Sequence, residues 1–121
     1  GCQTVVRTAT ADTDVTTGTW ADGRTGVFYG LRGGVLPHKV IVFGTDAVVE
    51  QKAADGNYAP LVREIMKFFQ TGIAPVSPEE TLEIYAFMEA ADESKRRGGA
   101  PVKISEVMEK NGGAGMLKGA P

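Results

Sequence analysis

Apolar and polar residues alternate through the first half of the chain, whereas the second half shows helical spacing. From residue 1 to about 52 the chain is rich in Thr, Val and Gly, and a period of two is typical of strands. From residue 57 to about 111, apolar residues recur every three or four positions. Strands followed by helices predict an α+β domain rather than repeated β-α-β units.

The first half predicts a meander of about five strands in a mostly antiparallel, twisted sheet. Asp22-Gly23 suits a tight hairpin turn, because Gly accepts a positive φ angle. Large apolar residues fall on both faces of these strands; in the third strand, Val27, Tyr29 and Leu31 are expected on one face and Phe28 on the other. Helices packed on one face would therefore leave the other face for a subunit or domain interface. Residues 38–43 (HKVIVF) are apolar enough for a central strand. The expected strands are 4–10, 14–20, 24–32, 38–43 and 47–52.

Two helices are predicted in the second half. The first spans residues 58–70 and ends before Gly72, which suits the left-handed conformation that follows many helices. The second begins after Ser77, which precedes Pro78 and has Glu80 three residues on, the pattern of a capping box. Its apolar stripe is expected to face the core and contains Ile84, Phe87, Met88 and Ala91.

The end of the chain carries weaker signals. Gly98-Gly99 is expected to stop the second helix. Residues 101–104 could return as a short edge strand, and 105–110 could form one more helical turn. We therefore expect one α+β domain over residues 1–111 and a flexible tail over 112–121, which has little to bury.

Composition and charge remove several classes of function. The chain has 121 residues, with 13 Lys and Arg against 15 Asp and Glu and a formal charge of −2. We therefore expect no nucleic acid and no membrane as partners. Binding to nucleic acid or to an anionic membrane needs a basic surface, and a membrane span needs an apolar run of ~20 residues. One cysteine, Cys2, and one histidine, His38, exclude an intramolecular disulfide, a cysteine zinc site and any site with two imidazoles.

Each candidate for chemistry has a simpler structural explanation. His38 precedes a predicted strand and has no local carboxylate to orient it as a general base. Cys2 precedes the first strand, and a structural thiol is the simpler interpretation. Acidic residues near a helix N-terminus favour its dipole, and the remaining ones suit a solvated face better than a metal site. These acidic residues are Glu79, Glu80, Glu83 and Glu89.

Three further patterns lead to the same expectation. Residues 113–119 (GAGMLKG) nearly match a dinucleotide fingerprint, but the third glycine comes one residue late and no strand precedes it. The aromatic residues Trp20, Phe28 and Tyr29 suit sheet packing better than base stacking. A cluster of threonines suits a half-exposed sheet, with a polar ligand surface as the alternative: Thr13, Thr16, Thr17 and Thr19. We therefore expect no catalytic, cofactor-binding or metal-binding residue.

Several segments are similar to one enzyme family. Residues 75–99, PVSPEETLEIYAFMEAADESKRRGG, resemble the C-terminal helix region of Gfo/Idh/MocA-type oxidoreductases, and so do residues 68–72 (FFQTG) before them. Residues 20–26 (WADGRTG) and 42–47 (VFGTDA) resemble that family's W-x-D-G-R hairpin and x-F-G-T-x turn. The resemblance covers about residues 1–104.

The resemblance implies a domain that follows an NAD(P)-binding Rossmann domain, closes over a sugar or polyol substrate, and forms homo-oligomers through its sheet face. NAD or NADP is thus implied for a parent enzyme. No catalytic residue carries over, because Glu109-Lys110-Asn111 lacks the proline of the family's Glu-Lys-Pro motif and His38 does not match its helical histidine signature. The opening Gly1-Cys2-Gln3, without an initiator methionine, agrees with a piece of a longer protein, and we expect the isolated chain to be inactive.

Two other interpretations stay open. The chain could be a free-standing α+β binding or scaffold module without catalytic activity. It could also be a small enzyme that uses His38 and an acid, which we rank last. A Rossmann-coding stretch upstream of Gly1 would favour the oxidoreductase interpretation, whereas a start codon there would favour the free-standing module. For the compartment, the cytoplasm is the expectation.

Overall fold

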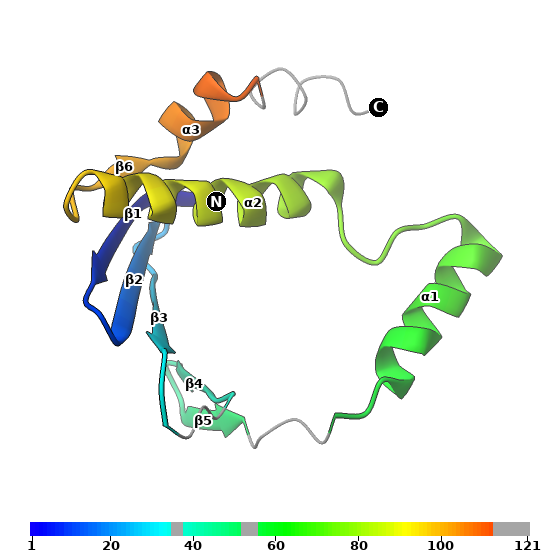
Figure 1. Cartoon of the computed structure of the whole chain (residues 1–121). Helices are drawn as coiled ribbons and strands as arrows, with labels where there is room; N and C mark the ends of the chain where they lie inside the picture. Colours follow the sequence, from blue (N-terminus) through cyan, green and yellow to red (C-terminus); the bar gives the residue numbers. More distant parts are fainter. Residues whose placement is uncertain (35–37, 52–55, 113–121) are drawn as a thin grey trace. The chain divides into compact units, whose positions relative to one another are not determined.

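A computed structural model describes residues 1–34, 38–51 and 56–112, and it confirms the predicted α+β class (Figure 1). The chain divides into two compact units, one made of residues 1–32 with residues from 76 onward, the other of residues 33–75. The elements in chain order are β1 (Cys2–Ala9), β2 (Thr13–Trp20), β3 (Thr25–Leu31), β4 (Val40–Phe43), β5 (Val48–Gln51), α1 (Ala59–Thr71), α2 (Pro78–Arg96), β6 (Val102–Lys103) and α3 (Ile104–Lys110).

The first unit contains a four-stranded antiparallel sheet in the order β3-β2-β1-β6. Val5 of β1 lies opposite Gly18 of β2 on one side and Val102 of β6 on the other. The predicted turn between β2 and β3 is confirmed, because Gly23 has a φ angle of 85° and the Trp20 N–H donates to the Arg24 carbonyl at 2.9 Å.

Helix α2 packs on one face of this sheet and has the predicted ends. The Glu80 N–H donates to the Ser77 Oγ at 3.0 Å, and Pro78 occupies the first turn. The helix ends before Gly98 and Gly99, which both have positive φ angles. Gly99 then donates its N–H to the carbonyl of Ser94 at 2.8 Å, and the chain continues into β6.

The face that α2 buries agrees with the expected one only in part, since Ala91 is buried and Phe87 packs against the core. Ile84 and Met88 are 52% and 55% exposed, so the expectation that they face the core is wrong. Small side chains face β1 instead, because they allow the helix to approach the strand closely and leave bulkier neighbours beside the contact. The buried α2 residues are Ala86, Ala90, Ala91 and Ser94. Together with Cys2, Val5, Val102 and Val107, Ala90 and Ala91 form the core, against which Trp20, Phe87 and Ile104 pack.

The second unit contains the β4-β5 hairpin and helix α1. In the described part of the chain β4 pairs with β5 alone, with Val42 opposite Val49, so 38–43 is not a central strand and the expected five-stranded meander is corrected to three strands and a separate hairpin. Strand neighbours are a tertiary property that apolar content does not specify. Helix α1 ends as predicted, since the N–H of Gly72 donates to the Phe68 carbonyl at 2.8 Å.

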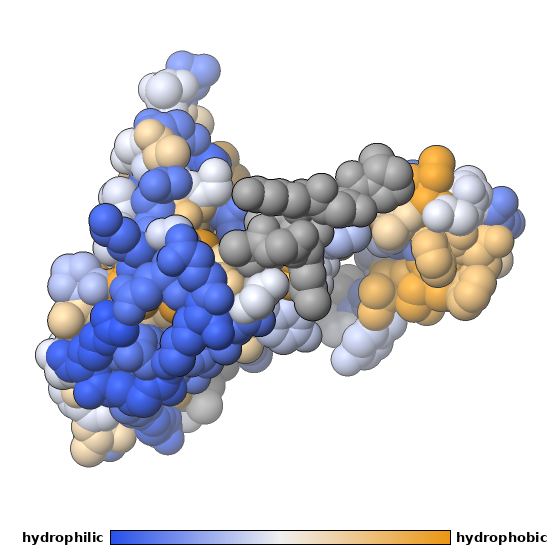
Figure 2. Space-filling model, turned by 90° about the horizontal axis from the view of Figure 1, so that it is seen from above, coloured by the Kyte–Doolittle hydropathy of each residue, from blue (hydrophilic) through white to orange (hydrophobic). Residues whose placement is uncertain are grey.

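Helix α1 is amphipathic and buries none of its residues. Its apolar side chains give the orange surface at the right of Figure 2. The exposed fractions include 55% for Leu61 and 81% for Phe69. The glycine-rich segment 113–119 and the predicted tail from residue 113 on lie outside the described residues.

Candidate functional site

The face of the first sheet that α2 does not cover is the largest feature with functional potential. Residues that lie opposite each other in an antiparallel pair share a face, and Val15 lies opposite Tyr29 while Thr17 lies opposite Val27. The alternate residues Asp14 and Thr16 are buried on the α2 side. We call the other side the open face; in β1, β2 and β3 it consists of Thr4, Val6, Thr8, Thr13, Val15, Thr17, Thr19, Thr25, Val27, Tyr29 and Leu31. At its margin Lys103 of β6 lies opposite Thr4.

The composition of the open face suits contact with another protein surface. Within β1, β2 and β3 it carries threonines, branched apolar residues and a tyrosine, but no charged side chain. Charged residues are depleted from the centres of protein interfaces, where Tyr is enriched. Val27 and Tyr29 are 66% and 63% exposed, and no described element of this unit packs over them.

The structure confirms the alternation predicted along β3. Val27, Tyr29 and Leu31 belong to the open face, and Phe28, opposite Thr16, lies on the α2 side. A Cβ atom added at Gly30 would lie 2.9 Å from the Phe28 ring, so the ring extends over that glycine. The predicted threonine cluster is divided between the faces, with Thr17 and Thr19 on the open face and Thr16 buried under α2.

A buried carboxylate organises the charges on the α2 side. Asp14 is 8% exposed, and its Oδ1 accepts from the Arg7 Nε at 3.0 Å and lies 3.9 Å from the Lys95 Nζ. Arg32 contacts the other oxygen, Oδ2, and Arg7 also pairs with Asp92 of α2. The cluster therefore joins β1, β2 and the residue after β3 to the helix.

This cluster was not predicted from the sequence, although one signal for it was present. Asp14 occupies the same alternating set of β2 positions as Gly18 and Trp20, which face the core. A carboxylate at a core-facing position requires cationic or hydrogen-bonding partners, because an unpaired buried charge is strongly unfavourable. The alternation in β2 could thus have pointed to a buried ion pair.

Cys2 lacks the surroundings of a nucleophile. Its side chain is buried, with the Sγ atom 3.6 Å from the Thr19 carbonyl oxygen and 3.8 Å from that of Thr4. Its backbone N–H donates to the Glu83 Oε1 at 2.6 Å. Burial raises the pKa of the Cys2 thiol, and the negative charge of Glu83 raises it further, so the protonated form is favoured at neutral pH.

The other candidates from the sequence do not converge on one site. His38 is exposed just before β4 in the second unit, whereas Glu79 and Glu80 are exposed in the first turn of α2. Trp20 stacks on Phe87 with ring centroids 6.2 Å apart, which is a packing contact within the first unit. Among residues 1–34, 38–51 and 56–112, no three His, Cys, Asp or Glu side chains are placed to hold a metal ion. No helix in these ranges is long and apolar enough to cross a membrane.

The C-terminal end of α2 carries a second charged cluster. Hydrogen bonds from Arg96 and Arg97 lower the pKa of the Glu93 carboxyl. Arg97 also pairs with Glu106 of α3 and lowers the pKa of that carboxyl. Arg96 reaches Glu89 at 2.7 Å. These exposed pairs connect α2 to α3.

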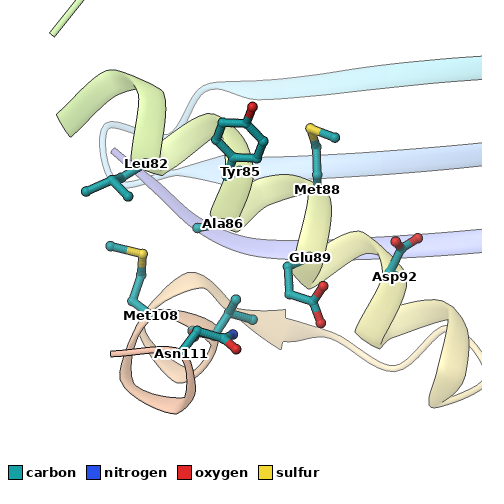
Figure 3. Close-up of a pocket in the computed structure, with 9 residues that line it drawn as sticks. Leu82, Tyr85, Ala86, Met88, Glu89, Asp92, Met108 and Asn111 are labelled. Carbon is teal, nitrogen blue, oxygen red and sulfur yellow. The ribbon is translucent and has the colours of Figure 1, made fainter. Parts of the chain in front are cut away.

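A pocket of about 400 Å³ lies between α2 and α3 (Figure 3). Its two carboxylates already have arginine partners, since Glu89 pairs with Arg96 and Asp92 pairs with Arg7. The other lining side chains are Leu82, Tyr85, Ala86, Met88, Val107, Met108 and Asn111. This largely apolar lining offers no general base with a partner to orient it.

A second pocket, of about 540 Å³, surrounds the Trp20–Phe87 stack. Two of the three charged side chains that line it are engaged, since Glu83 accepts the Cys2 N–H and Arg24 pairs with Asp22 at 2.7 Å. The third, Glu80, is exposed in the first turn of α2. The open face is thus the feature best suited to a function. Comparison of the chain with family models, curated proteins and solved structures found no match.

Proposed function

We propose that this chain is the C-terminal sheet domain of an NAD(P)-dependent oxidoreductase similar to the Gfo/Idh/MocA family, acting on a sugar or polyol. In that role it lines the substrate pocket and forms homo-oligomers through its sheet face. The observation that carries the proposal is the open face, a half-exposed to exposed sheet surface on which β1, β2 and β3 present Thr, Val, Tyr and Leu side chains and no charge. Exposed patches with apolar and aromatic side chains and few charges are typical of surfaces that bind other proteins.

The residues that carry the family resemblance also support the proposal, because they have definite roles in the fold. Ser77 caps α2, and Gly98 and Gly99 turn the chain from α2 toward β6. Ser94 is fully buried, accepts the Arg7 N–H at 2.8 Å and donates to the Ala100 carbonyl at 2.8 Å. Two proteins that share a domain are expected to keep the residues that determine its fold.

The proposal assigns hydride transfer to another domain. Hydride transfer requires a nicotinamide held against the substrate carbon, together with an acid or base beside it. The two pockets in the first unit are lined mainly by apolar side chains, and three of their four carboxylates, those of Glu83, Glu89 and Asp92, already have partners. A preceding Rossmann domain would supply the cofactor site and the catalytic groups, and the sheet domain would supply surface for substrate and subunit contacts.

Association of the purified chain tests the role of the open face. We expect a dimer or larger species in light scattering, and we expect Thr17→Lys to weaken association by at least about tenfold, because it places an unpaired charge in the contact. Ser105→Lys makes the same exchange at an exposed residue of α3 and is expected to leave association unchanged. A monomeric wild-type chain at high concentration, or equal behaviour of the two variants, would contradict the proposal.

A further inference from the structure

Strand β3 forms an edge of the sheet with a free row of backbone groups. The Trp20 N–H donates to Arg24 and the Arg32 N–H donates to Asp12, so the even-numbered residues of β3 form the hydrogen-bonded pairs with β2. The N–H and C=O groups of the odd-numbered residues therefore point away from β2. These residues are Thr25, Val27, Tyr29 and Leu31, and no hydrogen bond within the described residues uses their outward groups.

Nothing in β3 protects this edge against pairing with another strand. Natural edge strands are usually short or carry Pro, a charged side chain or a bulge. β3 has seven residues, TGVFYGL, with no Pro and no charge, and its register with β2 is regular. The opposite edge, β6, is only two residues long. The sheet is therefore open to extension at β3.

The sequence of β3 is nearly symmetric about Phe28. Gly26 and Gly30 lie two residues to either side of it, and Val27 and Tyr29 lie one residue to either side. We propose that β3 pairs antiparallel with β3 of a second copy of this chain, across a two-fold axis at Phe28, so that the two sheets become one continuous sheet.

This register satisfies the free backbone groups. Thr25 lies opposite Leu31 of the second copy, and Val27 lies opposite its Tyr29, so every outward N–H and C=O of β3 gains a partner. An aromatic side chain opposite a β-branched one is a favourable cross-strand pair. A shift of the register by one residue would place the outward groups of one strand against the inward groups of the other.

The side chains at the axis also fit. Phe28 meets Phe28 of the second copy on the α2 side, where each ring extends over the Gly30 of its own strand. At the ends, Arg24 would lie opposite Arg32 of the second copy. Each arginine already has a carboxylate partner, Asp22 and Asp14 respectively, which reduces the repulsion between them.

Disulfide trapping in a Cys2→Ser chain distinguishes this edge contact from contact through the open face. Phe28 pairs with itself in a non-hydrogen-bonded position, where Cα atoms are about 4.5 Å apart, within reach of a disulfide. We expect Phe28→Cys to form a covalent dimer under mild oxidation. Val27→Cys is the matched control, because its two copies would be two residues out of register and beyond the ~7 Å limit. Cross-linking of Val27→Cys without Phe28→Cys, or of neither, would overturn the proposal.

A second variant tests the backbone bonds directly. Tyr29→Pro removes an outward N–H that β2 does not use, so circular dichroism is expected to be retained while dimer affinity falls by at least about tenfold relative to Tyr29→Ala. Hydrogen exchange is expected to protect the Val27 and Tyr29 amides in the dimer and not in dilute monomer. Protection in the monomer would show that a segment of the same chain covers the edge, and the proposal would be wrong.

Discussion

Ser94→Ala removes a hydroxyl that holds α2 to the sheet. The Ser94 side chain is fully buried, and its Oγ accepts from the Arg7 N–H and donates to the Ala100 carbonyl, both at 2.8 Å. The variant removes the partner of two part-buried backbone groups, the Arg7 N–H and the Ala100 carbonyl. An unsatisfied buried group costs about 1–3 kcal/mol, and partial burial places each of these two in the lower half of that range, so we expect a loss of about 2–4 kcal/mol in the free energy of unfolding.

Urea unfolding followed by circular dichroism measures this loss. A decrease of 2–4 kcal/mol is a large fraction of the ~5–15 kcal/mol that stabilises a typical domain. Ser105→Ala is the matched control, because Ser105 is exposed on α3 and its change is expected to stay within ~0.5 kcal/mol. If Ser94→Ala unfolds within ~0.5 kcal/mol of the wild-type chain, the two hydrogen bonds do not have the role assigned to them.

Three further predictions concern packing, pH and cofactor binding. Gly18→Ala places a Cβ atom 2.6 Å from the Phe87 ring and is expected to lower the free energy of unfolding by about 1–3 kcal/mol in urea titrations. Gly33→Ala is the control, because no atom lies within 4 Å of its added Cβ and no clash arises. Hydrogen bonds from Arg96 and Arg97 lower the pKa of Glu93 below its ordinary 4.5. The stabilisation of the folded state by these bonds is therefore present above pH 4.5 and is lost as the pH falls further. Urea unfolding between pH 6 and pH 3 is expected to depend less on pH in Glu93→Gln, and parallel curves would refute this. Titration calorimetry of the chain with NAD(P) is expected to show no binding, and micromolar affinity would contradict the proposed function.

Local signals in the sequence predicted the ends of most elements. Gly23 allows the turn between β2 and β3, Ser77 and Pro78 begin α2, and Gly72 ends α1, because each acts on backbone groups a few residues away. The alternation along β3 was also predicted, since it follows from the geometry of a single strand. These features need no knowledge of the rest of the fold.

Features that depend on partners distant in sequence were not predicted. One such feature is that, within the part of the chain that the structure describes, β4 pairs with β5 alone. The buried face of α2, which contains Ser94, is another. Hydrophobicity alone favours the face with Ile84 and Met88, and the close approach of helix and strand, which selects small side chains, is not visible in the sequence. Of the candidate site, the sequence indicated an uncovered sheet face. The alternation in β2 could have placed Asp14 on the core side, but its partners and the free edge of β3 could not be derived without the strand register.

The closeness of α2 to β1 sets which substitutions each side of the helix can accept. A larger side chain at any of the buried positions would push the helix away from the strand, so only small residues are accepted there. These positions are Ala86, Ala90, Ala91 and Ser94. At Ile84 and Met88, which are about half exposed, bulk and even polarity can change with little effect on this unit. A library of variants designed to recruit a new partner should therefore randomise the second set and leave the first untouched.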